Sequence, residues 1–181
     1  MHFTIKEMNE NHAKEISTWT YKEPYNIYDG DDSEEFTKEL MDGSYFSVVD
    51  EKSDLVGYYC YGESAQVPAG KLYGVYAQEL LDVGLGMRPD LCGKGNGYDF
   101  FVNGLKFAQS KYSSKKFRLT VAAFNERAIK LYEKIGFVKT DTFVRAHSEE
   151  DFTFQVMILE IRFVVDQGGQ NGNQRYFIIR Q

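Results

Sequence analysis

Residues 80–97 read LLDVGLGMRPDLCGKGNG, and the rest of the chain is organised around this stretch. Its apolar first half predicts a central strand over Glu79–Met87. Gly93, Gly95 and Gly97 follow where a helix is expected to begin. Glycines at a strand-to-helix turn leave backbone N–H groups open to a bulky anion, and the positive end of the helix dipole adds to their attraction. The turn therefore predicts a phosphate-binding site.

A second stretch, residues 121–137, reads VAAFNERAIKLYEKIGF and predicts a strand followed by a helix that ends at Gly136. Asn125 and Tyr132 are seven positions apart, so two helical turns bring them to the same face. Ala128 lies between them, and its small side chain leaves room for a bound molecule. This face of the helix is a candidate part of the same site.

The glycine turn differs from the common nucleotide-binding loops. Six residues separate Gly86 from Gly93, whereas a P-loop has four, and the GxGxG spacing is not the GxGxxG of dinucleotide folds. Together, however, the two stretches resemble the motifs of the GCN5-related N-acetyltransferase (GNAT) superfamily. Residues 92–97 match its loop Arg/Gln-x-x-Gly-x-Gly/Ala except at Cys92. Its downstream motif is matched at every point, by Asn125, Ala128, Leu131, Tyr132, Glu133, Lys134, Gly136 and Phe137.

The resemblance implies an α/β (α+β) GNAT fold, in which a mixed, mostly antiparallel sheet carries helices on both faces and its central strand splays from its neighbour. It covers Glu79–Phe137 closely and the flanks in outline. We expect a single acetyltransferase domain over residues 1–162. Residues 163–181 are a C-terminal extension, which could be a tail or an extra strand that pairs within the fold or with a second subunit of a homodimer.

Alternation and capping signals place the other elements. Helices are expected over Asn9–Trp19, Ser33–Met41, Leu91–Ser110 and Asn125–Ile135. Strands are expected over His2–Met8, Tyr45–Asp50, Leu55–Tyr61, Phe117–Ala123, Phe137–Ala146 and Phe152–Arg162. Gly84 and Gly86 inside the central strand indicate a bulge or a close backbone approach instead of an ordinary ladder.

The resemblance further implies acetyl-coenzyme A as co-substrate. In the family its pyrophosphate lies on the turn formed here by Cys92, Gly93, Lys94, Gly95, Asn96 and Gly97. The pantetheine arm would lie against Gly86 and Met87, and Asn125 with Ala128 would contact it from the downstream helix. Tyr132 would protonate the leaving thiolate. The structural alternatives are a core position for Tyr132 and a plain helix N-cap for Asn125.

The general base is less clear from the residues. The two positions at which many GNAT enzymes carry a carboxylate fall at Leu81 and near Thr120, and neither side chain can act as a base. Asp82 is the nearest carboxylate and the candidate, with a hydrogen-bonded structural acid as the alternative. Proton transfer through an ordered water, or an amine that arrives neutral, is also open.

Cys92 stands where the family has Arg or Gln. Its thiol, near a helix N-terminus, could be reactive, but a small residue packed under the loop is the simpler interpretation.

The acceptor is expected against the aromatic and acidic segment Trp19–Asp32. Tyr25 and Tyr28 offer ring faces for a cationic amine, and Asp29, Asp31 and Asp32 would raise the concentration of that amine near the cleft. The alternative makes this segment a clasp that packs on the core.

Composition limits the remaining options. The chain has 181 residues, a net charge of −6 and no basic patch, so we expect no nucleic-acid partner. We expect no membrane association, because no apolar run is long enough to span a bilayer. The two cysteines show no pattern that would pair them in a disulfide, so we expect the reducing cytoplasm. The three histidines lack the spacing of metal ligands, so we expect no metal site. The expected function is acetyl transfer from acetyl-coenzyme A to a primary amine of a small-molecule or peptide acceptor by direct attack. The alternatives are transfer of a different acyl group and a coenzyme A-binding sensor with little turnover.

Overall fold

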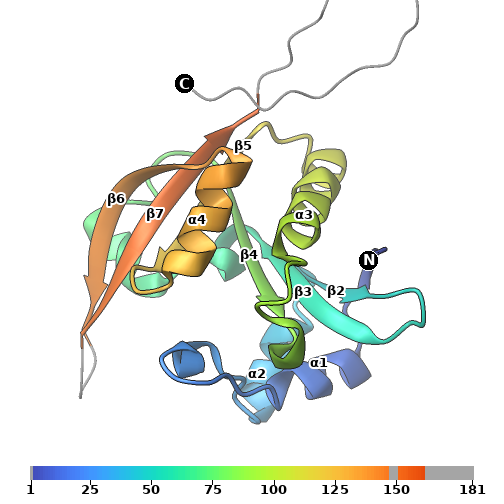
Figure 1. Cartoon of the computed structure of the whole chain (residues 1–181). Coiled ribbons are helices and arrows are strands. Elements are labelled where there is room, and N and C mark those ends of the chain that lie inside the picture. Colours follow the sequence, from blue (N-terminus) through green and yellow to red (C-terminus); the bar gives the residue numbers. More distant parts are fainter. Residues whose placement is uncertain (1, 147–150, 162–181) are drawn as a thin grey trace, which may run out of the picture.

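The computed structural model describes residues 2–146 and 151–161 of the chain. These residues form seven strands, four α-helices and four short 3₁₀ helices (Figure 1). The strands are β1 (Thr4–Glu7), β2 (Tyr45–Val49), β3 (Leu55–Tyr61), β4 (Leu81–Met87), β5 (Lys116–Ala122), β6 (Val138–Arg145) and β7 (Phe152–Glu160). The α-helices are α1 (Glu10–Ser17), α2 (Glu34–Leu40), α3 (Gly97–Tyr112) and α4 (Glu126–Ile135). Short 3₁₀ helices are η1 (Tyr25–Tyr28), η2 (Gly62–Ala65), η3 (Pro68–Tyr73) and η4 (Pro89–Leu91).

The seven strands form one sheet in the order β1-β2-β3-β4-β5-β7-β6. All neighbouring pairs are antiparallel except β4 and β5, which run parallel. The mixed, mostly antiparallel sheet predicted from the sequence is therefore confirmed. The extension over residues 163–181 lies outside the described residues.

Helix starts follow the local sequence where a polar side chain caps the first turn. Asn9 accepts a hydrogen bond from the backbone N–H of His12, and Ser33 accepts one from that of Phe36. Such caps satisfy backbone donors that have no partner inside the helix.

The start of α3 was predicted too early. The helix begins at Gly97 instead of Leu91. Gly93 and Gly95 take φ angles of +77° and +85°, in the left-handed region that a right-handed helix cannot contain. The chain therefore makes the η4 turn and an open loop before the helix can start.

Helices cover both faces of the sheet, because alternate strand residues point to opposite sides. On β3, Tyr59 and Tyr61 belong to the core under α3 and α4, whereas Tyr58 and Cys60 pack with α1 and α2. The α3–α4 side carries the larger core, with Phe100 fully buried at its centre.

The two parallel strands separate soon after they meet. β4 pairs with β5 only at Leu81–Phe117 and Asp82–Arg118. Beyond Asp82, β4 is bonded to β3 alone and β5 to β7 alone, as far as the described residues show. The splayed central strand expected from the resemblance is present, and it opens a gap in the middle of the sheet (Figure 1).

Candidate active site

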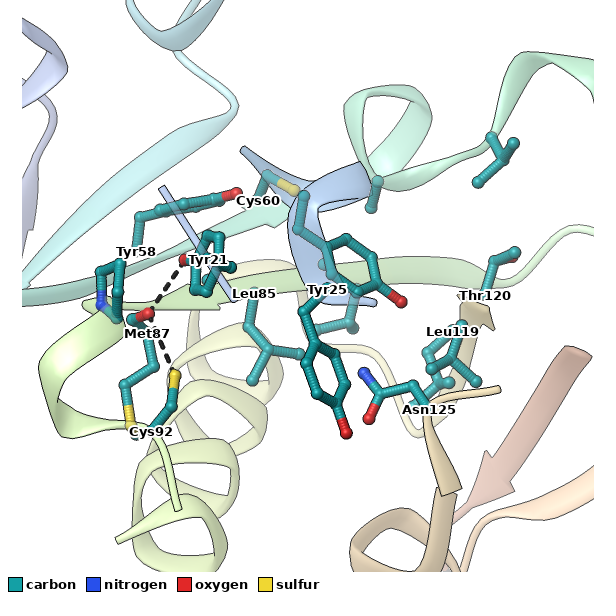
Figure 2. A pocket seen from close by; sticks show the side chains of 18 of the residues that line it. Tyr21, Tyr25, Tyr58, Cys60, Leu85, Met87, Cys92, Leu119, Thr120 and Asn125 are labelled. Atoms are coloured by element: carbon teal, nitrogen blue, oxygen red, sulfur yellow. Dashed lines mark hydrogen bonds between the residues drawn. The ribbon is translucent and has the colours of Figure 1, made fainter. Parts of the chain in front are cut away.

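A cavity of about 900 Å³ lies where β4 and β5 separate. Its walls come from the two diverging strands, from β3, from the first two turns of α4, and from residues 20–28 and 64–67. Most of the lining side chains are aromatic or apolar (Figure 2). A largely apolar cleft with a few convergent polar groups is typical of a ligand site.

The β4 wall of the cavity depends on glycine. Gly86 pairs with Tyr58 of β3, and a side-chain carbon at Gly86 would lie 2.3 Å from the Tyr58 ring. A carbon at Gly84 would lie 2.5 Å from the sulfur of Cys60. The expectation of a bulge or a close backbone approach at these glycines was wrong, because the β3–β4 register is regular and the space at each glycine is taken by a side chain of β3. Because β5 has moved away, the other edge of this stretch faces the cleft and pairs with no described strand. At Met87 the carbonyl oxygen already accepts from the Tyr21 hydroxyl and the Cys92 thiol.

The glycine turn lies at one end of the cleft. Gly95 has open space where a side chain would be, since no atom lies within 4 Å of a carbon built there. Backbone donors exposed by positive φ angles, followed by the N-terminus of the 16-residue helix α3, form an anion-binding geometry. The residues present fit the pyrophosphate predicted for Cys92, Gly93, Lys94, Gly95, Asn96 and Gly97.

Cys92 has a packing role in this loop. Its thiol donates to the carbonyl oxygen of Met87 at 3.5 Å (Figure 2). It also donates to the carbonyl oxygen of Arg88 at 3.7 Å. Burial raises the pKa of the Cys92 thiol, so the reactive thiolate is disfavoured. These contacts favour the interpretation of Cys92 as a small residue packed under the loop.

Helix α4 brings its two candidate residues to the cleft. The side chain of Asn125 accepts a hydrogen bond from the backbone N–H of Ala128 at 3.2 Å, so it is a helix N-cap as well as a cleft residue. Tyr132 is 8% exposed and its ring packs edge-on against Phe101, yet it also lines the cavity. Burial raises the pKa of Tyr132, which keeps the phenol protonated. A protonated phenol in the cleft has the form that a general acid needs.

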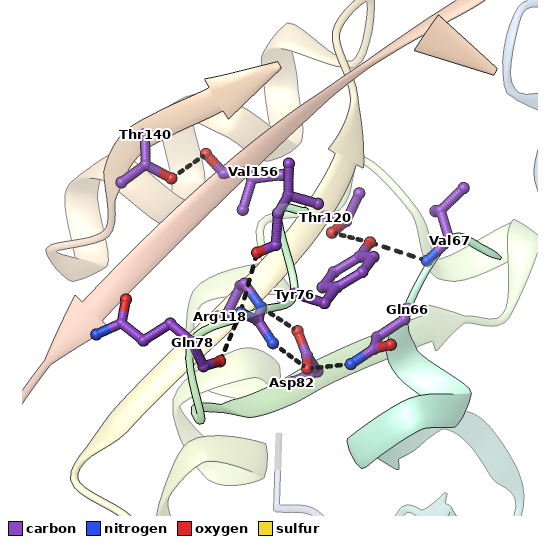
Figure 3. A network of polar contacts seen from close by, with 10 residues as sticks. Gln66, Val67, Tyr76, Gln78, Asp82, Arg118, Thr120, Thr140 and Val156 are labelled. Atoms are coloured by element: carbon purple, nitrogen blue, oxygen red, sulfur yellow. Dashed lines mark hydrogen bonds and ion pairs between the residues drawn. The ribbon is translucent and has the colours of Figure 1, made fainter. Parts of the chain in front are cut away.

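Asp82 lies outside the cleft lining, in a buried ion pair (Figure 3). Its carboxylate oxygens accept hydrogen bonds from Arg118 Nε at 2.6 Å and Nη2 at 2.7 Å. Gln66 Nε2 donates to the same carboxylate at 2.8 Å. The Asp82 residue is 2% exposed and its carboxylate accepts all three of these hydrogen bonds. It therefore connects β4 to β5 and to Gln66. The geometry thus favours the structural alternative over a general base.

Thr120, the other position considered for a base, is also engaged. Its hydroxyl is 2.9 Å from the hydroxyl of Tyr76, which accepts the backbone N–H of Val67 at 3.0 Å. The Tyr76 ring in turn lies under the Arg118 guanidinium, 4.8 Å from Cζ (Figure 3). The sequence motifs did not predict this network. A signal was present, because Arg118 interrupts an otherwise apolar strand and a buried cation needs a nearby acid.

Residues 19–32, which we call the acceptor segment, are bound to both diverging strands. The Tyr21 hydroxyl donates to the carbonyl oxygen of Met87 in β4 at 2.9 Å. The Tyr28 hydroxyl accepts the backbone N–H of Ala122 in β5 at 3.2 Å. The segment therefore bridges the cleft, and the structure gives Tyr28 a fixed position at the β5 side.

Tyr25 lies between these two attachments and also lines the cavity. Its ring is 5.8 Å from that of Phe124. The acids of the segment are placed differently from what we expected. Asp29 accepts the backbone N–H of Tyr21 at 2.6 Å, and neither it nor its neighbours Asp31 and Asp32 line the cavity.

The lining also contains aromatic residues that the sequence did not single out. Tyr45 and Tyr58 approach each other at 5.9 Å between ring centroids, and Trp19 stacks on Tyr58 at 6.2 Å. The Tyr45 hydroxyl donates to Glu39 Oε1 at 2.9 Å. Tyr45 and Tyr58 thus form a wall of rings on the β2–β3 side of the cleft, and the Glu39 carboxylate lies behind Tyr45.

Two negative findings concern the described residues only. No helix among them is long and apolar enough to cross a bilayer. No group of three or more His, Cys, Asp or Glu side chains within residues 2–146 and 151–161 is placed to hold a metal ion, and the prediction of no metal site stays a prediction.

The sheet splits between its two parallel strands, and the glycine turn lies between the end of β4 and the start of α3. Residues 11–137 match the family model described as "Acetyltransferase (GNAT) family". The chain belongs to this GNAT acetyltransferase family, as the resemblance of its two motifs implied.

Solved structures agree with the family at the level of the fold. Mutant forms of the spermidine/spermine N-acetyltransferase SpeG from Vibrio cholerae superpose with a TM-score of 0.63 at 19% identity, over 88% of this chain and 95% of that one. A GNAT-family acetyltransferase from Bacillus anthracis gives a TM-score of 0.66 at 15% identity, over 88% and 95% of the two chains. No curated protein is significantly similar to the chain in sequence. At these identities the structures show a shared fold and leave the acceptor open.

Proposed function

We propose that this protein transfers an acetyl group from acetyl-coenzyme A to a primary amine by direct attack. The observation that carries the proposal is the cleft between β4 and β5, which has an anion-binding turn at one end and the Tyr132 phenol on its wall. Family membership implies acetyl-coenzyme A as the co-substrate that supplies the reactive thioester.

Each half of the cleft has a role in this proposal. The turn over Cys92–Gly97 would hold the pyrophosphate with backbone N–H groups, and the free edge of β4 at Gly86 and Met87 would pair with the pantetheine arm. Asn125 and Ala128 would border that arm from α4. These contacts would fix the thioester beside the incoming amine, and such positioning accounts for a large part of catalysis in acyl transfer.

Tyr132 would act as the general acid. A thiolate leaving group needs a proton, and a buried phenol with a raised pKa is still protonated at neutral pH. Tyr132 lines the cleft, whereas Asp82 lies outside the lining and its carboxylate accepts hydrogen bonds from Arg118 and Gln66. We therefore propose that the amine loses its proton to water or reaches the cleft neutral, with no direct part for Asp82.

The side of the cleft that is lined by tyrosine rings would receive the acceptor. Tyr25 and Tyr28 of the acceptor segment, together with Tyr45 and Tyr58, offer ring faces that attract a cation. The Glu39 carboxylate behind Tyr45 adds negative charge on the same side. A cationic amine is the chemical class that fits, and polyamines, the acceptors named for the SpeG structures, are the first to try.

A second function has one specific observation in its favour. Among the described residues, Asp82 is the carboxylate nearest the usual base positions, and it forms an ion pair with Arg118. A coenzyme A-binding sensor with little turnover would need no free base there. Both cysteines are free, which suits the reducing cytoplasm in either case.

An amine panel separates the two functions. Release of free thiol from acetyl-coenzyme A would be measured with polyamines, aminoglycosides, amino acids and peptides bearing a free N-terminus. Turnover that depends on one amine class is the expected result. Tight coenzyme A binding by calorimetry, combined with no turnover of any amine, would replace the enzyme with the sensor.

A further inference from the structure

Arg127 lies between the glycine turn and the acceptor segment. It is the second residue of α4 and lines the cleft. Its guanidinium carbon is 5.1 Å from the centroid of the Tyr25 ring. A side-chain carbon built at Gly93 would lie 3.2 Å from Arg127 Nη1. One side chain therefore touches both the predicted pyrophosphate site and the predicted acceptor wall.

The acids next to Arg127 along α4 and near the glycine turn form ion pairs with other residues. Glu126, beside it on α4, is paired with Lys130 at 3.5 Å. Asp90, near the glycine turn, is paired with Arg88 at 2.7 Å. Within the described part of the chain, no carboxylate forms an ion pair with Arg127.

The glycine turn also begins with neither of the two residue types, arginine or glutamine, that start the family motif. Cys92 occupies that position, and its thiol is directed to two backbone carbonyl groups. A pyrophosphate on this turn would therefore contact backbone donors, and Cys92, the first residue of the loop, would add no positive charge. Arginine matches phosphate geometry with a planar set of donors, and it can stack on an aromatic ring at the same time.

We propose that Arg127 binds the pyrophosphate of the cofactor in place of the arginine or glutamine missing at Cys92. We also propose that, through its contact with Tyr25, Arg127 links cofactor binding to the order of the acceptor segment. The inference rests on the proposed function, because it takes coenzyme A as the ligand of the turn.

The linkage has a thermodynamic consequence. If the bound cofactor fixes Arg127 and Arg127 fixes Tyr25, the cofactor raises the affinity for the acceptor. The acceptor must then raise the affinity for the cofactor by the same factor. A single cation–π contact limits that factor to about two- to thirty-fold.

The first experiment measures coenzyme A binding by calorimetry in Arg127→Gln, with Lys130→Gln as the matched control. Both substitutions remove one exposed cation from α4, but Lys130 is paired with Glu126 on the helix surface. We expect a loss of about ten- to a hundred-fold in affinity for Arg127→Gln alone, as for a charge-assisted hydrogen bond. S-acetylpantetheine, which lacks the pyrophosphate, should inhibit both variants equally.

The second experiment measures hydrogen exchange of residues 20–28 with and without saturating coenzyme A. We expect the wild type to become protected, and Arg127→Gln and Tyr25→Leu to gain little protection. Tyr25→Leu should keep its coenzyme A affinity within about the thirty-fold limit of the contact. Equal coenzyme A affinity in Arg127→Gln and Lys130→Gln would overturn the role in binding, and full protection in Tyr25→Leu would overturn the linkage. A wild type that binds no coenzyme A would instead refute the proposed function.

Discussion

Replacing Asp82 by Asn tests whether this carboxylate is structural or catalytic. The substitution keeps the shape of the side chain and removes the charge that faces Arg118, a residue only 2% exposed. Removing one partner of a buried ion pair costs about 3–5 kcal/mol, because the other charge stays buried without compensation. Arg118 would keep the carbonyl acceptors of Val75 and Gln78 at 3.1 and 3.0 Å, so we expect a cost near the lower limit.

A loss of about 3 kcal/mol predicts a melting temperature about 6–12 °C lower for a domain of this size. Calorimetry or circular dichroism would measure it. Glu126→Gln is the control, since it removes the same charge from a pair whose side chains are 76% and 77% exposed and should change stability by less than about 1 kcal/mol. Below its melting temperature, Asp82→Asn should keep most of its turnover, with an unchanged pH profile.

The opposite pattern would refute the structural role. An unchanged melting temperature, with turnover reduced about 100-fold or more and an altered basic limb of the pH profile, would identify Asp82 as a general base.

Four further outcomes follow from the geometry. Gly95→Asp, which places a charge in the open space of the turn, should abolish coenzyme A binding in calorimetry while Gly95→Ala retains part of it; equal affinities would contradict the pyrophosphate site. Tyr132→Phe should lower turnover about 100- to 10,000-fold with little change in melting temperature, and a loss within about two-fold would leave Tyr132 as a core residue only. Tyr28→Ala should raise the KM of the amine that the panel identifies and leave coenzyme A affinity unchanged, whereas a lower melting temperature with the same KM would assign the ring to packing alone. Burial raises the pKa of phenols such as Tyr58 above that of the unfolded chain, so the contribution of these phenols to stability should be constant below about pH 10 and fall as the pH rises beyond it; phenolate absorbance that appears before circular dichroism changes would argue against this.

Much of the fold could be predicted because its signals are local. The caps at Asn9, Ser33 and Asn125 and the glycine at Gly136 each act within one helical turn, and all four lie at helix ends in the structure. Alternating residues likewise predicted the strands to within a few positions. The glycine turn was recognised because positive φ angles favour one residue type.

The candidate site was harder to predict because its contacts join distant parts of the chain. Asp82 meets an arginine 36 residues later, and only the parallel register of β4 and β5 places the two side by side. Tyr28 reaches Ala122, 94 residues away, and Arg127 reaches Tyr25 across the cleft. No periodicity or motif encodes such pairs. They depend on where β4 and β5 separate and on how the acceptor segment crosses the gap.

The bridge formed by the acceptor segment places the proposed acceptor contacts and the proposed cofactor contacts in different parts of the sequence. Everything proposed to hold the cofactor comes from β4 to α4, apart from the Tyr25 contact of Arg127, whereas one continuous wall of the acceptor side comes from residues 19–32. That wall is attached to the sheet at its two ends, through Tyr21 and Tyr28. Under the proposed function, exchange of the residues between those two attachments would remodel the acceptor side and would reach the cofactor side through the Tyr25–Arg127 contact. The proposed function thus allows the choice of amine to be changed by rewriting a short early part of the chain.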